Sequence, residues 1–266
     1  LLRDARAAAE AAATLADAHR ATAMIGRTLL QQALPTTFGL RAAGWLVGID
    51  EAVAELARVR DRRLAVQMGG PVGARGPAIA ARVAADLELV EPVLPWQAIR
   101  VRPAALAAAL GGLCGVLAKV ARDVTLLAQQ EVGEVREGGG PGRGGSSAMA
   151  HKRNPVGAVS VLACAKRAPG LVATMLACME QEHERAAGAW QAEWGVEKEL
   201  LALAGSAAAW ARELLEGLEV DGERMRANLA AAVTGDEPLP EGAGELIDRA
   251  LAAHRAAGRA AGGIRG

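Results

Sequence analysis

The sequence predicts an all-α fold, built as a bundle of long helices. Strand signals are almost absent, because the 266 residues include one Phe and no Tyr and show little alternation of apolar with polar side chains. Ala- and Leu-rich stretches with helical periodicity run for about 25 to 30 residues, well beyond the usual mean helix length. Helices of this length indicate a bundle that is extended through oligomerisation.

In the first half of the chain, breaks separate the expected helices. A break is expected over residues 26–37, and Pro35 suits the first turn of the helix that follows. The stretch QMGGPVGARG (67–76) is expected to be a glycine-rich loop. The helices predicted for this half cover residues 1–23, 35–66 and 78–90.

The second half follows the same pattern, with an extended linker at EPVLPW and a loop over residues 234–244. Asn154 and Pro155 predict a helix start, with Asn as the cap and Pro at the first helical position. The helices predicted here cover residues 103–133, 155–182, 189–217, 221–230 and 244–258. We divide the chain into a central bundle domain, residues 1–230, and a C-terminal helical segment, residues 231–266, expected to be truncated.

Composition excludes several classes of partner and compartment. Thirty basic and thirty acidic side chains cancel, which argues against a general nucleic-acid binder. No apolar run of about 18 residues is free of charges, so no membrane span is expected. Cys114, Cys164 and Cys178 form no CxxC pair, which predicts reduced, buried, inert thiols. No signal peptide precedes Leu1, and we expect a cytoplasmic protein.

The stretch GGGPGRGGSSAMAHKRNP (138–155) has the composition of a mobile site. Its glycines give the backbone freedom to open and close over a ligand. Ser146 and Ser147 offer hydroxyls, Lys152 offers a positive charge, and Asn154 with the N–H groups of the following helix could receive an anion. A disordered linker ending in an ordinary helix start remains the alternative. The GxxxxGK[ST] spacing of a P-loop is absent.

Other polar and aromatic residues have simpler interpretations. His151 and His183 have no partner at ligand spacing, so no metal site is predicted. Trp190 and Trp194 are four residues apart on one helical face, which favours core packing over substrate stacking. Three further tryptophans are expected in the core, and two histidines are expected to be solvated: Trp45, Trp96, Trp210, His19 and His254.

Three motifs carry a family resemblance. SSAMAHKRNP (146–155) closely resembles the SSxMPxKxNP signature of the fumarase/aspartase superfamily, with Ala150 in place of the usual proline. GRTLLQQALPTTFG (26–39) is similar to the superfamily's GRTHLQPAxPTTFG, and QMGG followed by VG (67–73) resembles its glycine-rich segment after the first bundle helix. On these motifs the chain is identified as a member whose N-terminal domain is expected to be missing.

The resemblance implies bond making or breaking β to a carboxylate, without a cofactor or metal. In the superfamily a carbanion forms beside the carboxylate, so an aci-carboxylate dianion must be stabilised. The catalytic residues implied are Ser146 for proton transfer, with Lys152 and Asn154 stabilising the dianion. The substrate-binding residues implied are Arg27, Thr28, Gln31, Ser147, Met149 and Gln67. The substrate would be a small dicarboxylate or tricarboxylate, and the protein a homotetramer with sites shared between subunits.

Two departures indicate the branch of the superfamily. Leu29 stands where fumarase-like, adenylosuccinate-cleaving and argininosuccinate-cleaving members have a histidine that serves the leaving group as an acid. No arginine lies between Arg185 and Arg212, which disfavours a nucleotide phosphate. The PGRGGSS lead-in, the HKRNPVGA continuation and the HERxxGxWxxEW segment (183–194) resemble the bacterial cycloisomerase branch.

That branch implies an intramolecular reaction in the protocatechuate (β-ketoadipate) pathway. A carboxylate oxygen adds across a conjugated double bond and the adjacent carbon is protonated, giving 4-carboxymuconolactone. A carboxylate needs no acid catalyst, which agrees with Leu29, and Ser146 would donate the proton. Two alternatives remain open: a lyase that releases fumarate from adenylosuccinate or argininosuccinate, and a non-catalytic structural homologue.

Overall fold

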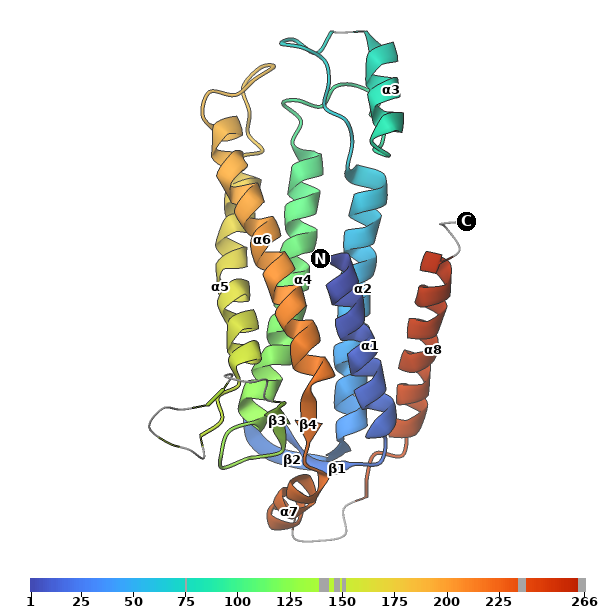
Figure 1. The fold of residues 1–266 in the computed structure, drawn as a ribbon, viewed down its shortest axis with the longest axis vertical. Coiled ribbons are helices and arrows are strands. Elements are labelled where there is room, and N and C mark those ends of the chain that lie inside the picture. The colour runs from blue at the N-terminus through green and yellow to red at the C-terminus, as the bar shows by residue number, and fades with distance from the viewer. Residues whose placement is uncertain (75, 139–143, 146–148, 150–151, 234–237, 263–266) are drawn as a thin grey trace.

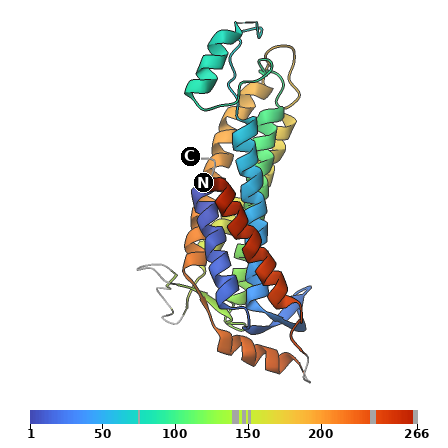
Figure 2. The ribbon, with the colours of Figure 1, turned by 90° about the vertical axis from the view of Figure 1, so that its right-hand side faces the viewer.

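The computed structural model describes residues 1–266 except 75, 139–143, 146–148, 150–151, 234–237 and 263–266. Four long helices run side by side in Figures 1 and 2: α2 (Phe38–Arg63), α4 (Val101–Leu127), α5 (Val156–Ala177) and α6 (Ala189–Glu216). Two further helices pack alongside them, α1 (Leu2–Ala18) against α2 and α6, and α8 (Ala243–Gly262) against α2. The all-α bundle predicted from the sequence is confirmed.

Short elements close the two ends of the bundle. The lower end in Figure 1 carries a hairpin of β1 (Ala23–Thr28) with β2 (Gln31–Thr37), a ladder of β3 (Val135–Glu137) with β4 (Leu218–Val220), and α7 (Gly222–Ala232). The upper end carries α3 (Pro77–Asp86) and its flanking loops. Both strand pairs are antiparallel. The expectation that strands would be almost absent is wrong at these two places.

The start of α2 also differs from the prediction. Pro35 lies inside β2, opposite Ile25, and not in a helical turn. The helix begins three residues later because Thr37 is its N-cap: the Thr37 Oγ1 accepts a hydrogen bond from the Leu40 N–H at 3.1 Å. Threonine is a strong N-cap, and here it fixes the junction between hairpin and bundle.

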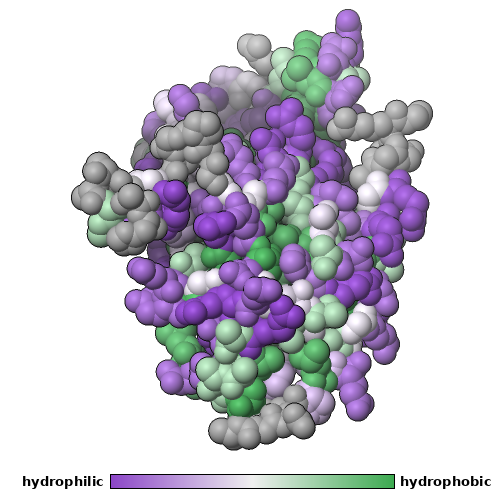
Figure 3. Space-filling model, turned by 60° about the horizontal axis from the view of Figure 1, so that its bottom comes forward, coloured by the Kyte–Doolittle hydropathy of each residue, from purple (hydrophilic) through white to green (hydrophobic). Residues whose placement is uncertain are grey.

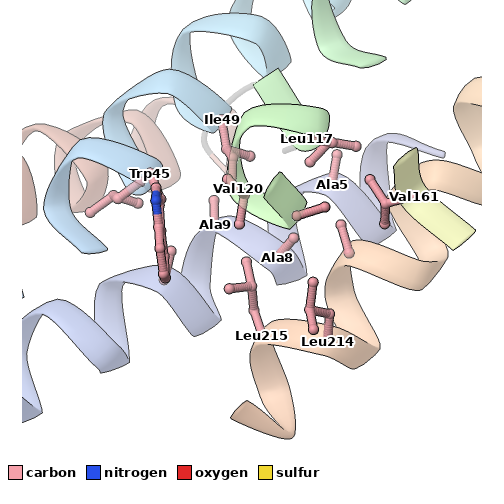
Figure 4. Close-up of a cluster of buried hydrophobic side chains, with 14 of the residues drawn as sticks. Ala5, Ala8, Ala9, Trp45, Ile49, Leu117, Val120, Val161, Leu214 and Leu215 are labelled. Atoms are coloured by element: carbon pink, nitrogen blue, oxygen red, sulfur yellow. The ribbon is translucent and has the colours of Figure 1, made fainter. Parts of the chain in front are cut away.

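Small residues on α1 allow it to lie close against the bundle. Ala5, Ala8 and Ala9 are buried and pack with larger side chains of α2 and α6, including Trp45 and Leu215 (Figure 4). The Trp45 indole N–H donates to the Asp123 carboxylate at 2.7 Å, so this large side chain is buried without losing its polar partner.

Two of these helices, α4 and α5, are long and apolar enough to cross a membrane by length and composition alone. The apolarity of α4 is explained by its place in the bundle, where it packs against α2, α5 and α6. In α5, which packs on α4 and α6, only 28% of the most apolar window is buried. An apolar face of α5 is therefore left uncovered within one chain.

His254 links α8 to the bundle. Its Nδ1 lies 2.9 Å from an Asp50 carboxylate oxygen on α2, and its Nε2 lies 2.9 Å from a Glu10 oxygen on α1. The side chain is 16% exposed, so the prediction of a solvated histidine is wrong. His19 is also half-buried, edge-on against Phe38. Burial lowers the pKa of His254, but hydrogen bonds and charge from Glu10 and Asp50 outweigh it and raise the pKa above the ordinary 6.5.

This arrangement predicts a pH-dependent contribution to stability. Because the pKa of His254 is raised on folding, the stabilisation is fully present below pH 6.5 and is lost as pH rises through the folded-state pKa. Solvent screens part of the effect at the exposed Glu10. We expect the wild-type Tm to fall by about 2 °C more than that of His254→Gln between about pH 6 and about pH 8. Thermal melts followed by circular dichroism measure this, and parallel pH dependences would contradict it.

Candidate active site

Arg27 is held by a buried carboxylate at the lower end of the bundle. Its two terminal nitrogens donate to the two Glu134 oxygens at 2.7 and 2.9 Å, and Glu134 is fully buried. The Asn228 amide on α7 donates to the same carboxylate at 2.8 Å. This paired geometry fixes the Arg27 guanidinium, so both of its terminal nitrogens already have a partner within the chain.

The hairpin places Thr28 and Gln31 as a facing pair at its exposed tip. Leu29 and Leu30 form the turn between them, with φ angles of 51° and 64°. A two-residue hairpin turn of type I′ has positive φ at both positions, which Asn and Gly adopt readily and leucine does not. Leu29 is 96% exposed and Leu30 73% exposed. Strained, exposed apolar residues of this kind are typical of a functional contact.

The described part of the signature lies at the same end of the bundle, between β3 and α5 in the chain. Met149 and Lys152 are exposed, and the Lys152 N–H donates to the Met149 carbonyl at 3.0 Å. Asn154 donates to the Gly144 carbonyl from its backbone N–H at 2.8 Å and from its side chain at 3.2 Å. Ser146 and Ser147, the predicted lid glycines over 139–143 and His151 lie outside the described residues.

The predicted cap of α5 is wrong. Pro155 occupies the cap position, α5 begins at Val156, and the Asn154 side chain binds Gly144 and not the helix. The carboxylate of Glu137 takes the capping role instead, accepting hydrogen bonds from the N–H groups of Gly157 at 2.9 Å and of Ala158 at 2.7 Å.

The first four N–H groups of α5 therefore all have partners inside the chain. Besides the two bound by Glu137, the Val156 N–H donates to the Asn154 carbonyl and the Val159 N–H to the Pro155 carbonyl, both at 2.9 Å. The expectation that these N–H groups would receive the carboxylate of a substrate does not hold in this structure, because Glu137 and the backbone already bind them. Side chains must supply the contacts to a carboxylate here.

A cleft of about 860 Å³ opens beside these residues. Lys152 and Asn154 line it from the signature, and Arg136 and Glu137 line it from β3. The surface at this end of the molecule is largely hydrophilic, with hydrophobic patches between the polar side chains (Figure 3). Its size and polar lining suit a small charged ligand.

Gln67 lies at the other end of the bundle. Its side-chain oxygen accepts from the Trp96 backbone N–H at 2.9 Å, and its amide donates to Gln97 at 3.2 Å. Because α2 has 26 residues, it separates Gln67 from the hairpin by about 39 Å. The structure thus brings Arg27, Thr28, Gln31, Lys152 and Asn154 to one end of the chain, and Gln67 to the opposite end.

Gln67 lines a pocket of about 300 Å³ together with Arg100, Arg185 and Trp190. The Arg185 guanidinium lies over the Trp190 ring, 4.8 Å from its centroid. Trp190 meets Trp194 edge to face at 5.2 Å. Because Trp194 is 57% exposed and Trp190 half-buried, the predicted core role of this pair is wrong.

An ion pair beneath this pocket was not found from the sequence. Arg100 and Glu193 are 8% and 1% exposed and form two hydrogen bonds, one of them at 2.9 Å. The Gln181 amide donates to Glu193 at 3.1 Å. Burial raises the pKa of Glu197, one turn along α6, and the charge of Glu193 adds to this while Arg100 opposes it.

The cysteines and the remaining tryptophans fit the core only in part. Cys114 and Cys178 are buried, and burial raises both thiol pKa values, that of Cys114 to about 11. Cys164 and Trp210 are half-buried at the edge of the core, and Trp96 is half-buried beside Gln67 and Val66, against expectation. Among the residues that the structure describes, no three His, Cys, Asp or Glu side chains are grouped to hold a metal ion. The predictions of no metal and no cofactor stay predictions.

Comparison with known proteins relates the chain to a family of lyases and cycloisomerases. A family profile described as Lyase matches residues 1–170. The chain is 47% identical to a 3-carboxy-cis,cis-muconate cycloisomerase of Bradyrhizobium diazoefficiens over 225 residues, 82% of this chain and 50% of that protein. It is 44% identical to a nitrosuccinate lyase of Streptomyces davaonensis over 241 residues, 85% of this chain and 50% of that protein. The chain thus spans about half the length of the curated relatives it matches.

A solved structure shows the same fold. The crystal structure of 3-carboxy-cis,cis-muconate lactonizing enzyme from Pseudomonas putida aligns with a TM-score of 0.87 at 32% identity, covering 96% of this chain and 72% of that one. The apolar helices α4 and α5 accordingly belong to the bundle of a soluble enzyme fold.

Proposed function

The chain belongs to this lyase family, the fumarase/aspartase superfamily, and we propose that its protein is a 3-carboxy-cis,cis-muconate cycloisomerase. Relatives with this name are 47%, 46% and 41% identical to the chain. These three relatives are the observation that carries the proposal, and Leu29, at the hairpin tip beside Thr28, supports it against the members that release an amine. A leucine cannot protonate a leaving group, so its presence favours a reaction in which the leaving or attacking group is a weak base.

The proposed chemistry is an intramolecular addition. A substrate carboxylate oxygen attacks a conjugated double bond, and electron density moves onto the carboxylate beside the other carbon. Lys152 and Asn154 stabilise that aci-carboxylate by charge and hydrogen bonding. Ser146 then donates its proton to the carbon, which completes the lactone. Arg27, Thr28, Gln31, Ser147 and Met149 are proposed to orient the substrate.

The active form is proposed to be a cytoplasmic homotetramer whose sites are shared between subunits. Gln67 lies about 39 Å from the hairpin along α2, so one chain cannot bring all the proposed residues together. The uncovered apolar face of α5 and the exposed Leu29 and Leu30 support contact with further copies. Balanced charge gives no support to a nucleic-acid partner.

Nitrosuccinate elimination is the second candidate, because a relative of that name is 44% identical to the chain. Nitrite is also a weak base and needs no acid catalyst, so Leu29 does not separate this reaction from lactonisation. Leu29 does weigh against adenylosuccinate and argininosuccinate cleavage, in which an amine or guanidine leaves. The presence of Ser146, Lys152 and Asn154 weighs against a non-catalytic homologue.

Direct assay distinguishes these reactions. The purified full-length tetramer is expected to remove the absorbance of 3-carboxy-cis,cis-muconate and to form 4-carboxymuconolactone. Parallel samples with nitrosuccinate, argininosuccinate and adenylosuccinate are checked for fumarate, or for nitrite in the first case. Turnover of nitrosuccinate with none of the muconate would replace the proposal by the second candidate, and no turnover of any would support a non-catalytic protein.

A further inference from the structure

Glu137 joins two segments that flank the signature. It is the last residue of β3, and its carboxylate accepts the N–H groups of Gly157 and Ala158 in the first turn of α5. A charged acceptor at a helix N-terminus is favoured both by direct hydrogen bonding and by the helix dipole. The contact spans 20 residues of sequence, with the whole signature between its partners.

The backbone of Glu137 is itself held in place. Glu137 pairs with Leu218 across the β3–β4 ladder, and the Gly138 N–H donates to the Gly217 carbonyl at 2.7 Å. The close approach of the carboxylate also depends on Gly157. A Cβ at that position would lie 3.3 Å from a Glu137 oxygen, tighter than most such contacts.

Within the described residues, Glu137 is the only side chain that caps α5, because Pro155 has no cap hydrogen bond and Asn154 binds Gly144. Asn154 precedes Gly157 by three residues and Lys152 precedes it by five. A change in where α5 begins therefore moves both residues, and displacements of about 1 Å in a site can cost about 100-fold in rate.

We propose that Glu137 is a positioning residue, whose carboxylate anchors the first turn of α5 and so holds Lys152 and Asn154 in their working positions. The proposal rests on the proposed function in one respect, namely that these two residues act on the substrate. Glu137 would act through these two residues, although it also lines the cleft.

Two variants test this from opposite sides. Glu137→Gln keeps the shape but turns an NH₂ group toward an N–H donor, so one hydrogen bond and the charge are lost. Gly157→Ala keeps the charge, pushes the carboxylate away, and favours the helix itself, since alanine is the better helix former. Both are expected to lower kcat for 3-carboxy-cis,cis-muconate by about 10- to 100-fold, with KM changed less than about threefold and tetramers retained.

Amide hydrogen exchange provides a readout that does not depend on activity. In Glu137→Gln, the Gly157 and Ala158 amides are expected to exchange faster than in the wild type, while those of α8 are unchanged. Leu251→Ala, a buried change on α8, controls for general destabilisation and is expected to keep kcat. If the wild type lacks turnover, the proposed function fails. Amide hydrogen exchange at Gly157 and Ala158 then still tests whether Glu137 anchors the first turn of α5. Unchanged exchange at Gly157 and Ala158, or wild-type kcat in both variants, overturns the proposal.

Discussion

Ser146→Ala is expected to lower the turnover of 3-carboxy-cis,cis-muconate by about 10³-fold or more, which is within the range that a positioned proton donor contributes. The hydroxyl is the proposed source of the proton that the carbon gains when the lactone closes. Without it, the aci-carboxylate held by Lys152 and Asn154 would return to substrate faster than water could protonate it. Substrate binding depends on other side chains, so KM should change little and the tetramer should remain intact.

Ser160→Ala is the matched control. Ser160 lies in α5, where its hydroxyl donates to the Val156 carbonyl at 2.8 Å, so the change removes the same atom outside the site. Its kcat should stay within about twofold of the wild type, since such surface or helix substitutions are usually mild. Steady-state kinetics and analytical ultracentrifugation measure both variants. Activity that survives in Ser146→Ala would show that another group transfers the proton.

The helices were predictable because alanine and leucine recur with helical periodicity, which is set by local sequence. The strands were missed because their signals are unusual. The β1–β2 turn is Leu29-Leu30 where Asn-Gly would be expected, and Pro35 indicated a helix start although it lies in a strand. The ladder of β3 with β4 has three residues in each strand, too few for alternation to be visible.

The candidate site was predictable to the extent that it lies in contiguous motifs. Lys152 and Asn154 belong to the signature, and both line the lower cleft. The carboxylates that hold the site could not be placed, because Glu134 binds Arg27 and Glu137 binds the first turn of α5, and both partners are far along the chain. One signal was present: Glu134 and Glu137 flank Val135 and Arg136 just before the glycines, and a charge that becomes buried needs a partner.

The buried pair of Arg100 and Glu193 gives the largest expected effect on stability. Glu193→Ala would leave the Arg100 guanidinium in a site where it is 8% exposed. Its remaining partners would be the Gln97 carbonyl at 3.2 Å, the Trp96 ring and, without a hydrogen bond, the charge of Glu197. Removing one partner of such a pair typically costs about 3–5 kcal/mol, because the other charge stays buried without compensation. For a chain of this size that corresponds to a fall in Tm of about 10 °C.

The same physical argument predicts how the loss is recovered. If the cost comes from an uncompensated charge, then removing both charges in Arg100→Met with Glu193→Leu should restore most of the stability, since apolar replacements of a buried pair are often neutral. Glu55→Ala breaks the exposed pair with Arg58 and should change stability by less than about 0.5 kcal/mol. Urea titrations and thermal melts of the four proteins measure this. A double variant as unstable as Glu193→Ala would contradict this explanation. It would mean that the hydrogen-bonding geometry of the pair stabilises the upper end of the bundle, and not the neutralisation of one buried charge by the other.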